Sequence, residues 1–168
     1  GYHDYLEDDL RLQDRLYLGD GNGNFIKSKN ALPSQYISTG SVAAGDITGD
    51  GFIDIFVGGK VIPGRYPETP TSLLLINDGK GQFTDQINSL APELQKLGMI
   101  TDAIWIDLNH DNAMDLIVVG EWMPISVFIN KEGKLTNETS HYFDRPYSGW
   151  WNTVEISDFN KDGNPDII

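Results

Sequence analysis

The sequence predicts an all-β protein made of β-propeller blades, each with four antiparallel strands. Three observations predict this fold: an acidic nine-residue motif occurs three times, a glycine-rich turn motif keeps step with it, and short apolar runs flank both. The acidic motif recurs at intervals of about 50 to 60 residues, which is in the range of propeller blades. We therefore expect each repeat to form one blade.

The acidic motif occupies residues 46–54, 107–115 and 158–166, and each copy has Asp at positions one, five and nine. Position three carries a side-chain oxygen, and we expect the backbone carbonyl of position seven to join it. Oxygens at alternate positions of a tight loop suit Ca²⁺, a hard cation that takes about six to eight oxygen ligands. The predicted ligands are Asp46, Thr48, Asp50, Phe52 and Asp54 in the first copy, Asp107, Asn109, Asp111, Ala113 and Asp115 in the second, and Asp158, Asn160, Asp162, Asn164 and Asp166 in the third.

The sixth and twelfth positions separate this motif from other acidic loops. Gly51 and Gly163 at position six permit the positive φ of a sharp turn, and Asn112 is among the few residues that tolerate it. An EF-hand needs Glu at position twelve, where this chain has Val57 and Val118, so an EF-hand is excluded. Asx-Gly runs also form plain turns without any metal. Three copies with three carboxylates each favour a cation, because uncompensated carboxylates this close repel one another.

Short apolar runs rich in β-branched residues flank each acidic loop and predict strands rather than helices. They lie before the loops at 42–44, 103–106 and 154–156, and after them at 55–57, 116–119 and 167–168. The turn motif is an apolar run followed by Asp-Gly-x-Gly and an aromatic residue, which predicts a β-hairpin. Its copies are 16–25, 74–83 and a weaker one at 127–135. One helical connector is expected at 91–97.

These elements divide the chain into a partial blade at 1–40, blades at 41–90 and 100–140, and a partial blade at 148–168. Together they amount to about three blade equivalents, whereas closed propellers typically have about four to eight blades. We therefore expect the chain to be a fragment of a longer propeller. The alternative is that several copies of the chain close a ring together.

Composition excludes several function classes. The net charge of −13 and the pI near 4.3 disfavour nucleic-acid binding, because an acidic surface repels phosphate backbones. There are no cysteines, so disulfides and thiolate chemistry are excluded. No stretch approaches the roughly 18 apolar residues of a membrane span. No nucleophile elbow or phosphate-binding loop appears, so we expect no catalytic residues.

The acidic loops, each set between two strands, resemble the FG-GAP (VCBS-type) repeats of integrin-like β-propellers. The resemblance covers most of the chain from Leu16 onward. Specific matches are the segments 45–51 and 158–163. Three further segments are similar to bacterial members associated with an ASPIC/UnbV-type domain: 63–67, 77–83 and 149–152.

The resemblance implies a seven-bladed propeller in the parent protein and a binding role rather than catalysis. It also implies a setting outside the cell or in the cell envelope, such as the periplasm or outer-membrane surface of a bacterium. Thr48 and Asn112 depart from the family pattern. These departures weaken the expected calcium occupancy of their two loops, but not the expected fold.

Five residues are candidates for contact with a ligand: Arg65, Tyr66, Trp122, Trp150 and Trp151. Arg65 and Tyr66 lie in the longest insertion, 60–71, and loops commonly carry binding groups. The tryptophans can stack on sugar rings. We expect them instead to pack between blades, because they lie where strands begin or end.

Two classes of function follow. The first is a calcium-binding, non-catalytic recognition or adhesion module with a protein or carbohydrate ligand. The alternative is the propeller part of a carbohydrate-active enzyme such as a polysaccharide lyase. A lyase needs a basic or phenolic group near its substrate, and Arg65 with Tyr66 is the pair that suggests one.

Overall fold

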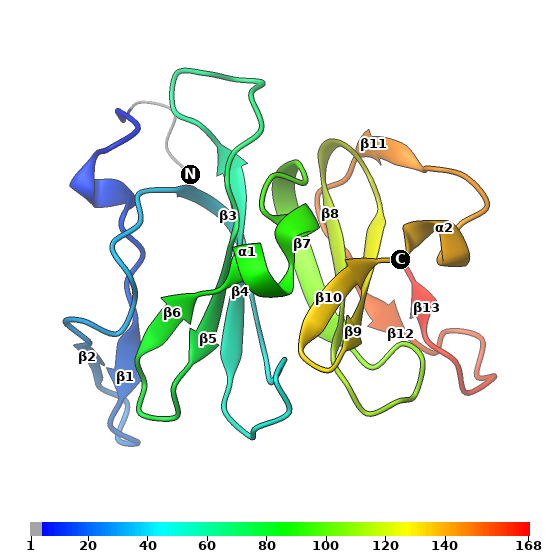
Figure 1. The fold of residues 1–168 in the computed structure, drawn as a ribbon, viewed down its shortest axis with the longest axis horizontal. Helices are drawn as coiled ribbons and strands as arrows, with labels where there is room; N and C mark the ends of the chain where they lie inside the picture. Colours follow the sequence, from blue (N-terminus) through cyan, green and yellow to red (C-terminus); the bar gives the residue numbers. More distant parts are fainter. Residues whose placement is uncertain (1–4) are drawn as a thin grey trace.

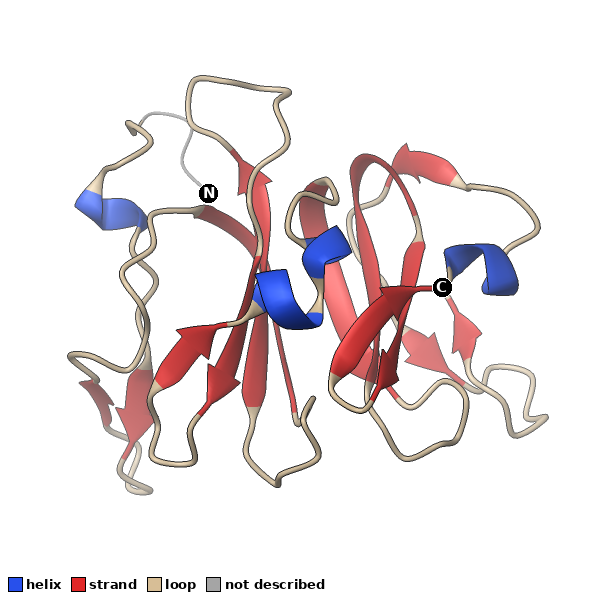
Figure 2. Cartoon of the chain, in the orientation of Figure 1, coloured by secondary structure: helices blue, strands red, loops and turns tan. Residues whose placement is uncertain are grey.

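The computed structural model describes residues 5–168, so the first four residues of the predicted partial blade lie outside it. Two antiparallel sheets, of four and five strands, stand side by side, with a two-stranded sheet at each outer flank (Figure 1). The helices are short turns between strands, as Figure 2 shows. The predicted all-β fold of four-stranded antiparallel blades is confirmed, and the arrangement is that of part of a β-propeller.

The first blade is a four-stranded meander in which each strand pairs with the next along the chain. Its strands are β3 Ser38–Gly45, β4 Asp54–Val61, β5 Leu73–Asn77 and β6 Phe83–Asp85. The strand β4 is buried along most of its length, which matches its apolar sequence. The connection from β4 to β5, residues 62–72, projects beyond the end of the sheet (Figure 1).

The second blade repeats this arrangement and adds one strand. Its strands are β7 Met99–Ile106, β8 Asp115–Pro124, β9 Ser126–Lys131 and β10 Lys134–Asn137. The added strand, β11 Ser148–Trp150, pairs with the last residues of β8. This strand was not predicted, because three residues are too few to show a strand pattern.

The outer flanks are hairpins of short strands. One consists of β1 Tyr17–Gly19 and β2 Phe25–Lys27, and the other of β12 Ile156–Ser157 and β13 Asp166–Ile167. They form two separate sheets within the described part of the chain. The acidic motif at 158–166 connects β12 to β13, as predicted for a loop between two strands.

The helical connector differs from the prediction of one segment at 91–97. The helix α1 spans Ile87–Leu90, and a separate 3-10 turn, η2, spans Pro92–Leu94. The carboxylate of Asp85 accepts the N–H of Ile87, the first residue of the helix, at 3.1 Å. Ala91, at φ −152°, interrupts it before Pro92. Two further turns were not predicted, η1 Leu10–Leu12 and α2 Thr139–Tyr142. No helix in residues 5–168 is long and apolar enough to cross a membrane.

The two blades share one hydrophobic core, whose buried members include Phe56 and Leu74 from the first blade and Leu116 and Phe128 from the second. The blades approach so closely that two facing positions must be glycine. A Cβ added to Gly40 would lie 2.1 Å from the carbonyl oxygen of Ile100, and one on Gly58 would lie 2.5 Å from its side chain. Close packing of β7 against β3 and β4 therefore fixes the blades relative to one another.

Candidate functional site

The three acidic loops connect β3 to β4, β7 to β8 and β12 to β13. The first two lie at the same end of the two blades (Figure 1). Each loop leaves one strand and returns in the next antiparallel strand, and its ninth residue pairs with the residue just before its first, as Asp54 does with Gly45 and Asp115 with Ile106. The loops thus share one place in the repeat as well as one sequence pattern.

The first Asp of each loop binds the backbone of its own turn. In the second loop the two carboxylate oxygens of Asp107 accept the N–H groups of Asp111 and Asn112, both at 3.0 Å. In the third loop, Asp158 accepts the N–H groups of Asp162 and Gly163 at 3.0 and 2.9 Å. The first loop has the same arrangement around Asp46. One hydrogen-bond pattern therefore shapes all three turns.

Position three joins the same cluster in two of the loops. The amide oxygen of Asn109 accepts the N–H of Asp111 at 3.0 Å, so it lies beside the Asp107 oxygen bound to that N–H. The amide nitrogen of Asn109 also donates to the Asp111 carboxylate at 2.9 Å. Asn160 makes the equivalent contacts with Asp162 in the third loop. Side-chain oxygens from positions one, three and five are thus gathered at one point.

The loop backbone adopts left-handed conformations at positions four and six. The first loop meets this requirement with glycines, Gly49 and Gly51. The second uses His110 and Asn112, at φ 61° and 68°, and the third has Lys161 at φ 63°. A left-handed Lys or His is uncommon and costs energy, which is typical of loops shaped for a function.

In the first two loops the ninth Asp has a different environment from the other carboxylates. Asp54 and Asp115 are fully buried, and each binds the loop on one side and the third strand on the other. One oxygen of Asp115 accepts the N–H of Leu108 at 3.1 Å, and the other accepts that of Asn130 at 2.8 Å. Burial raises the pKa of Asp115, and the nearby charges of Asp111 and Asp107 raise it further. This carboxylate therefore ties the loop to the sheet.

The arrangement of these carboxylates shows how far the loops suit a metal ion. In the part of the chain that the structure describes, no group of three Asp, Glu or His side chains is arranged to hold a metal ion. The exposed rim of each loop instead combines two carboxylates with a hydroxyl or amide oxygen from position three. An all-oxygen set fits Ca²⁺ in kind. The backbone N–H groups of Phe52, Ala113 and Asn164 donate to the fifth Asp of their loops.

Two asparagines complete these loops and were missed by the sequence analysis. Asn77 is the last residue of β5 and Asn130 the last but one of β9, and both donate their backbone N–H groups to the ninth Asp. The buried side chain of Asn130 also donates to the carbonyl oxygen of Ile47 in the first loop at 2.8 Å, which joins the two blades. The sequence does contain a signal for them, because an Ile-Asn pair ends the apolar run of both turn motifs, at 76–77 and at 129–130.

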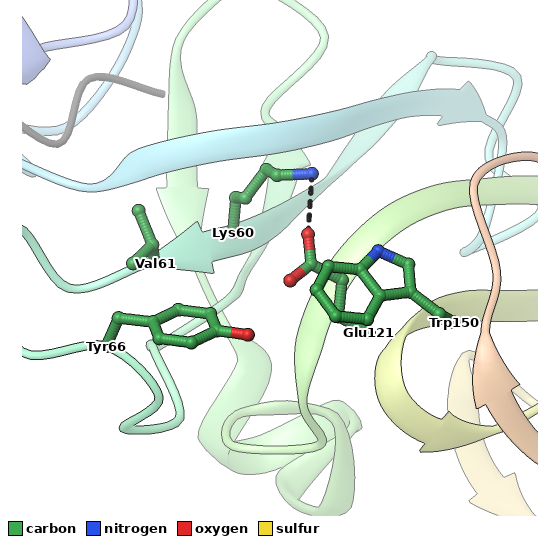
Figure 3. A pocket seen from close by; sticks show the side chains of 5 residues that line it. All are labelled: Lys60, Val61, Tyr66, Glu121 and Trp150. Carbon is green, nitrogen blue, oxygen red and sulfur yellow. Dashed lines mark ion pairs between the residues drawn. The ribbon is translucent and has the colours of Figure 1, made fainter.

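A second candidate site lies at the opposite end of the strands, in a cleft between the two blades. Its volume is about 450 Å³, and its lining includes Lys60, Val61, Tyr66, Glu121 and Trp150 (Figure 3). Lys60 and Glu121 form an ion pair of 3.2 Å across the blades. The indole N–H of Trp122 donates to the Tyr66 hydroxyl at 2.8 Å beside this cleft. We call this group of residues the interblade cleft.

The structure brings three of the five ligand candidates together and separates the other two. The expectation that the tryptophans pack between blades is wrong for Trp122 and Trp150, which are 66% and 52% exposed. It holds for Trp151, which packs against the cluster that joins the second blade to β12 and β13. Arg65 lies next to Tyr66 but is paired with two glutamates, Glu7 and Glu68.

Comparison with known families gives one match. The model of a family described as an FG-GAP-like repeat matches residues 7–57 and 107–168, which together make up well over half of the chain. The first matched segment contains the first acidic loop, and the second contains the other two. No curated protein matches the chain.

Proposed function

Because the chain belongs to the FG-GAP-like repeat family, we propose that it is a calcium-binding, non-catalytic recognition module. Repeats of this family are found in integrin-like recognition and adhesion modules, typically of extracellular or cell-envelope proteins. The observation that carries the calcium proposal is the shared geometry of the three loops. The bacterial ASPIC/UnbV-associated type stays a prediction.

Calcium bound to these loops neutralises the carboxylates and stiffens the turns. Positions one, three and five would supply the exposed oxygens in each loop, and in the first two loops the ninth Asp ties the loop to the third strand. Loops two and three use an Asn amide at position three, whereas Thr48 makes no equivalent contact among the hydrogen bonds of residues 5–168. We therefore expect the first loop to be the weakest of the three sites.

The test is a thermal melt in chelator and in millimolar calcium, with calorimetric titration of calcium. Binding to the folded form alone raises stability by mass action, by about 2.7 kcal/mol per site when calcium is 100 times its Kd. For a chain of this length each kcal/mol raises the Tm by about 2–4 °C. No rise in the Tm of the wild-type protein would contradict the proposal.

Matched variants assign the effect to the loops. The triple variant Asp50→Asn, Asp111→Asn, Asp162→Asn removes one charge per loop but keeps an oxygen that can accept the position-seven N–H. It is expected to lose the calcium-dependent rise. The control Asp78→Asn changes an exposed Asp that accepts two turn N–H groups in the same way, but in a hairpin without the nine-residue motif. The control should respond to calcium like the wild type.

The absence of catalysis is also a proposal, and it rests on the surroundings of Arg65. The two glutamates that bind this guanidinium raise its pKa, so it is committed to ion pairs and is a poor proton acceptor. Incubation with a panel of polysaccharides tests the alternative of a lyase. Eliminative cleavage that Tyr66→Phe abolishes would replace the recognition proposal by an enzymatic one.

A further inference from the structure

We propose that the interblade cleft binds a neutral sugar ring, which it holds by aromatic stacking and by the Lys60–Glu121 pair. This inference deepens the proposed recognition function and rests on it. The cleft lies at the end of β4 and β8 opposite the acidic loops, because Lys60 and Glu121 each follow the ninth Asp of their loop by six residues. At about 3.3 Å per residue, roughly 20 Å separates the two sites.

Three exposed aromatic side chains lie in or next to this cleft: Tyr66 and Trp150 line it, and Trp122 lies beside it. Trp122 is 66% exposed, Trp150 52% and Tyr66 48%, although large aromatic side chains are usually well buried. The rings of Trp122 and Trp150 pack against each other with centroids 5.0 Å apart and planes 59° apart. The Trp122–Tyr66 hydrogen bond holds the third ring in place. The apolar C–H face of a sugar ring is a natural partner for such rigid aromatic faces.

The backbone of Trp122 is strained in a way that presents its indole. In the pairing of β8 with β11, Gly149 faces Met123 and Trp150 faces Glu121, so Trp122 is the unpaired residue of a β-bulge. Its φ is 59°, in the left-handed region that bulky residues avoid. Bulges commonly redirect a side chain beside a binding site. A residue without a function here would more favourably be glycine.

The polar side chains of the cleft indicate which class of ligand it can bind. The Lys60 ammonium donates hydrogen bonds and the Glu121 carboxylate accepts them, and sugar hydroxyls can do both. The Glu121 side chain is only 11% exposed, so its position is well fixed. Because the two charges pair, the site has no net charge with which to attract an ionic ligand.

Two other ligand classes fit less well. Aromatic groups beside a carboxylate can form a cage for a quaternary ammonium group, but here the Lys60 ammonium lies next to that carboxylate and repels cations. An anionic ligand is repelled by the chain as a whole, whose net charge is −13. The cleft volume of about 450 Å³ lies within the roughly 300–1,000 Å³ of small-molecule sites. A neutral saccharide therefore agrees best with these observations.

The experiment titrates the protein with neutral oligosaccharides based on glucose, galactose, mannose and N-acetylglucosamine, followed by tryptophan fluorescence and calorimetry. At least one of them is expected to bind. Trp122→Ala and Trp150→Ala should each weaken that binding by about tenfold or more. Phe25→Ala, which removes an aromatic ring that is 72% exposed on β2, should leave it unchanged.

A further variant separates binding from folding. Trp122→Gly relieves the left-handed strain and is expected to match or exceed the Tm of Trp122→Ala, yet to bind sugar no better than Trp122→Ala does. The inference is overturned if no neutral sugar binds, if the tryptophan variants bind as well as the wild type, or if choline binds instead. Melts with calcium on the same samples keep the two proposals apart, since a calcium effect without sugar binding overturns only this one.

Discussion

The hydrogen bond between Asn130 and the first acidic loop can be tested with a matched pair of substitutions. Asn130 and Asn77 occupy equivalent places, because each side chain donates to a carbonyl oxygen of its own blade, Met114 or Ile53, at 3.1 Å. Asn130 alone of the two also donates to the buried Ile47 carbonyl at 2.8 Å. Asn130→Ala is therefore expected to destabilise the protein more than Asn77→Ala does.

The difference can be estimated from the one additional bond. Removing the partner of a buried polar group costs about 1–3 kcal/mol, because the group left behind has no water to bind. Both variants lose hydrogen bonds at exposed or half-buried positions, and these losses largely cancel in the comparison. For a chain of this length, the extra loss corresponds to a Tm lower by roughly 2–12 °C.

The assay is urea and thermal denaturation of both variants in chelator, so that calcium bound to the loops cannot contribute to the measured stability. Equal slopes of free energy against urea would show that the unfolding transition itself is unchanged. Equal destabilisation of Asn77→Ala and Asn130→Ala would refute the reasoning. In that case the bond between Asn130 and Ile47 does not help to hold the blades together.

Two further predictions concern pH and close packing. Burial raises the pKa of Asp14, so stability from this carboxyl is present below its ordinary pKa of 3.8 and is lost as pH rises through the raised value. Asp14→Asn keeps an oxygen that can accept from Thr39, and it should therefore raise the Tm near neutral pH. This gain in Tm should vanish in melts at progressively lower pH. A gain that is independent of pH would contradict the prediction. Gly40→Ala places a Cβ 2.1 Å from the Ile100 carbonyl oxygen, and it should lower the free energy of unfolding in urea by about 1–3 kcal/mol. An unchanged urea midpoint would show that the blades can shift apart.

The strands and acidic loops were predictable because their signals are local. Alternation of apolar runs with Asx-Gly turns shows which segments extend and which reverse, and both blades follow that pattern. The left-handed φ of Asn112 was expected from its place in the motif, and the structure has it at 68°. The left-handed φ of Lys161 could not be anticipated in this way, because lysine does not favour that conformation.

The features that sequence reasoning missed depend on contacts between distant segments. Trp150 and Trp151 are adjacent, yet one faces the cleft and the other packs in the core, because β11 joins the edge of β8. The burial of Asp115 depends on Asn130 in the third strand. This dependence cannot be predicted from the spacing of residues within the loop. The ion pair between Lys60 and Glu121 likewise exists only because two blades meet.

Lys60 and Glu121 occupy the same position in successive repeats, and yet they carry opposite charges. The junction between the two blades is therefore bridged by residues from one shared position of the repeat. Opposite charges hold such a junction together, and like charges would force it open. In a protein built of repeated blades, the residue at this position can in this way give each junction its own selectivity while every blade keeps the same scaffold.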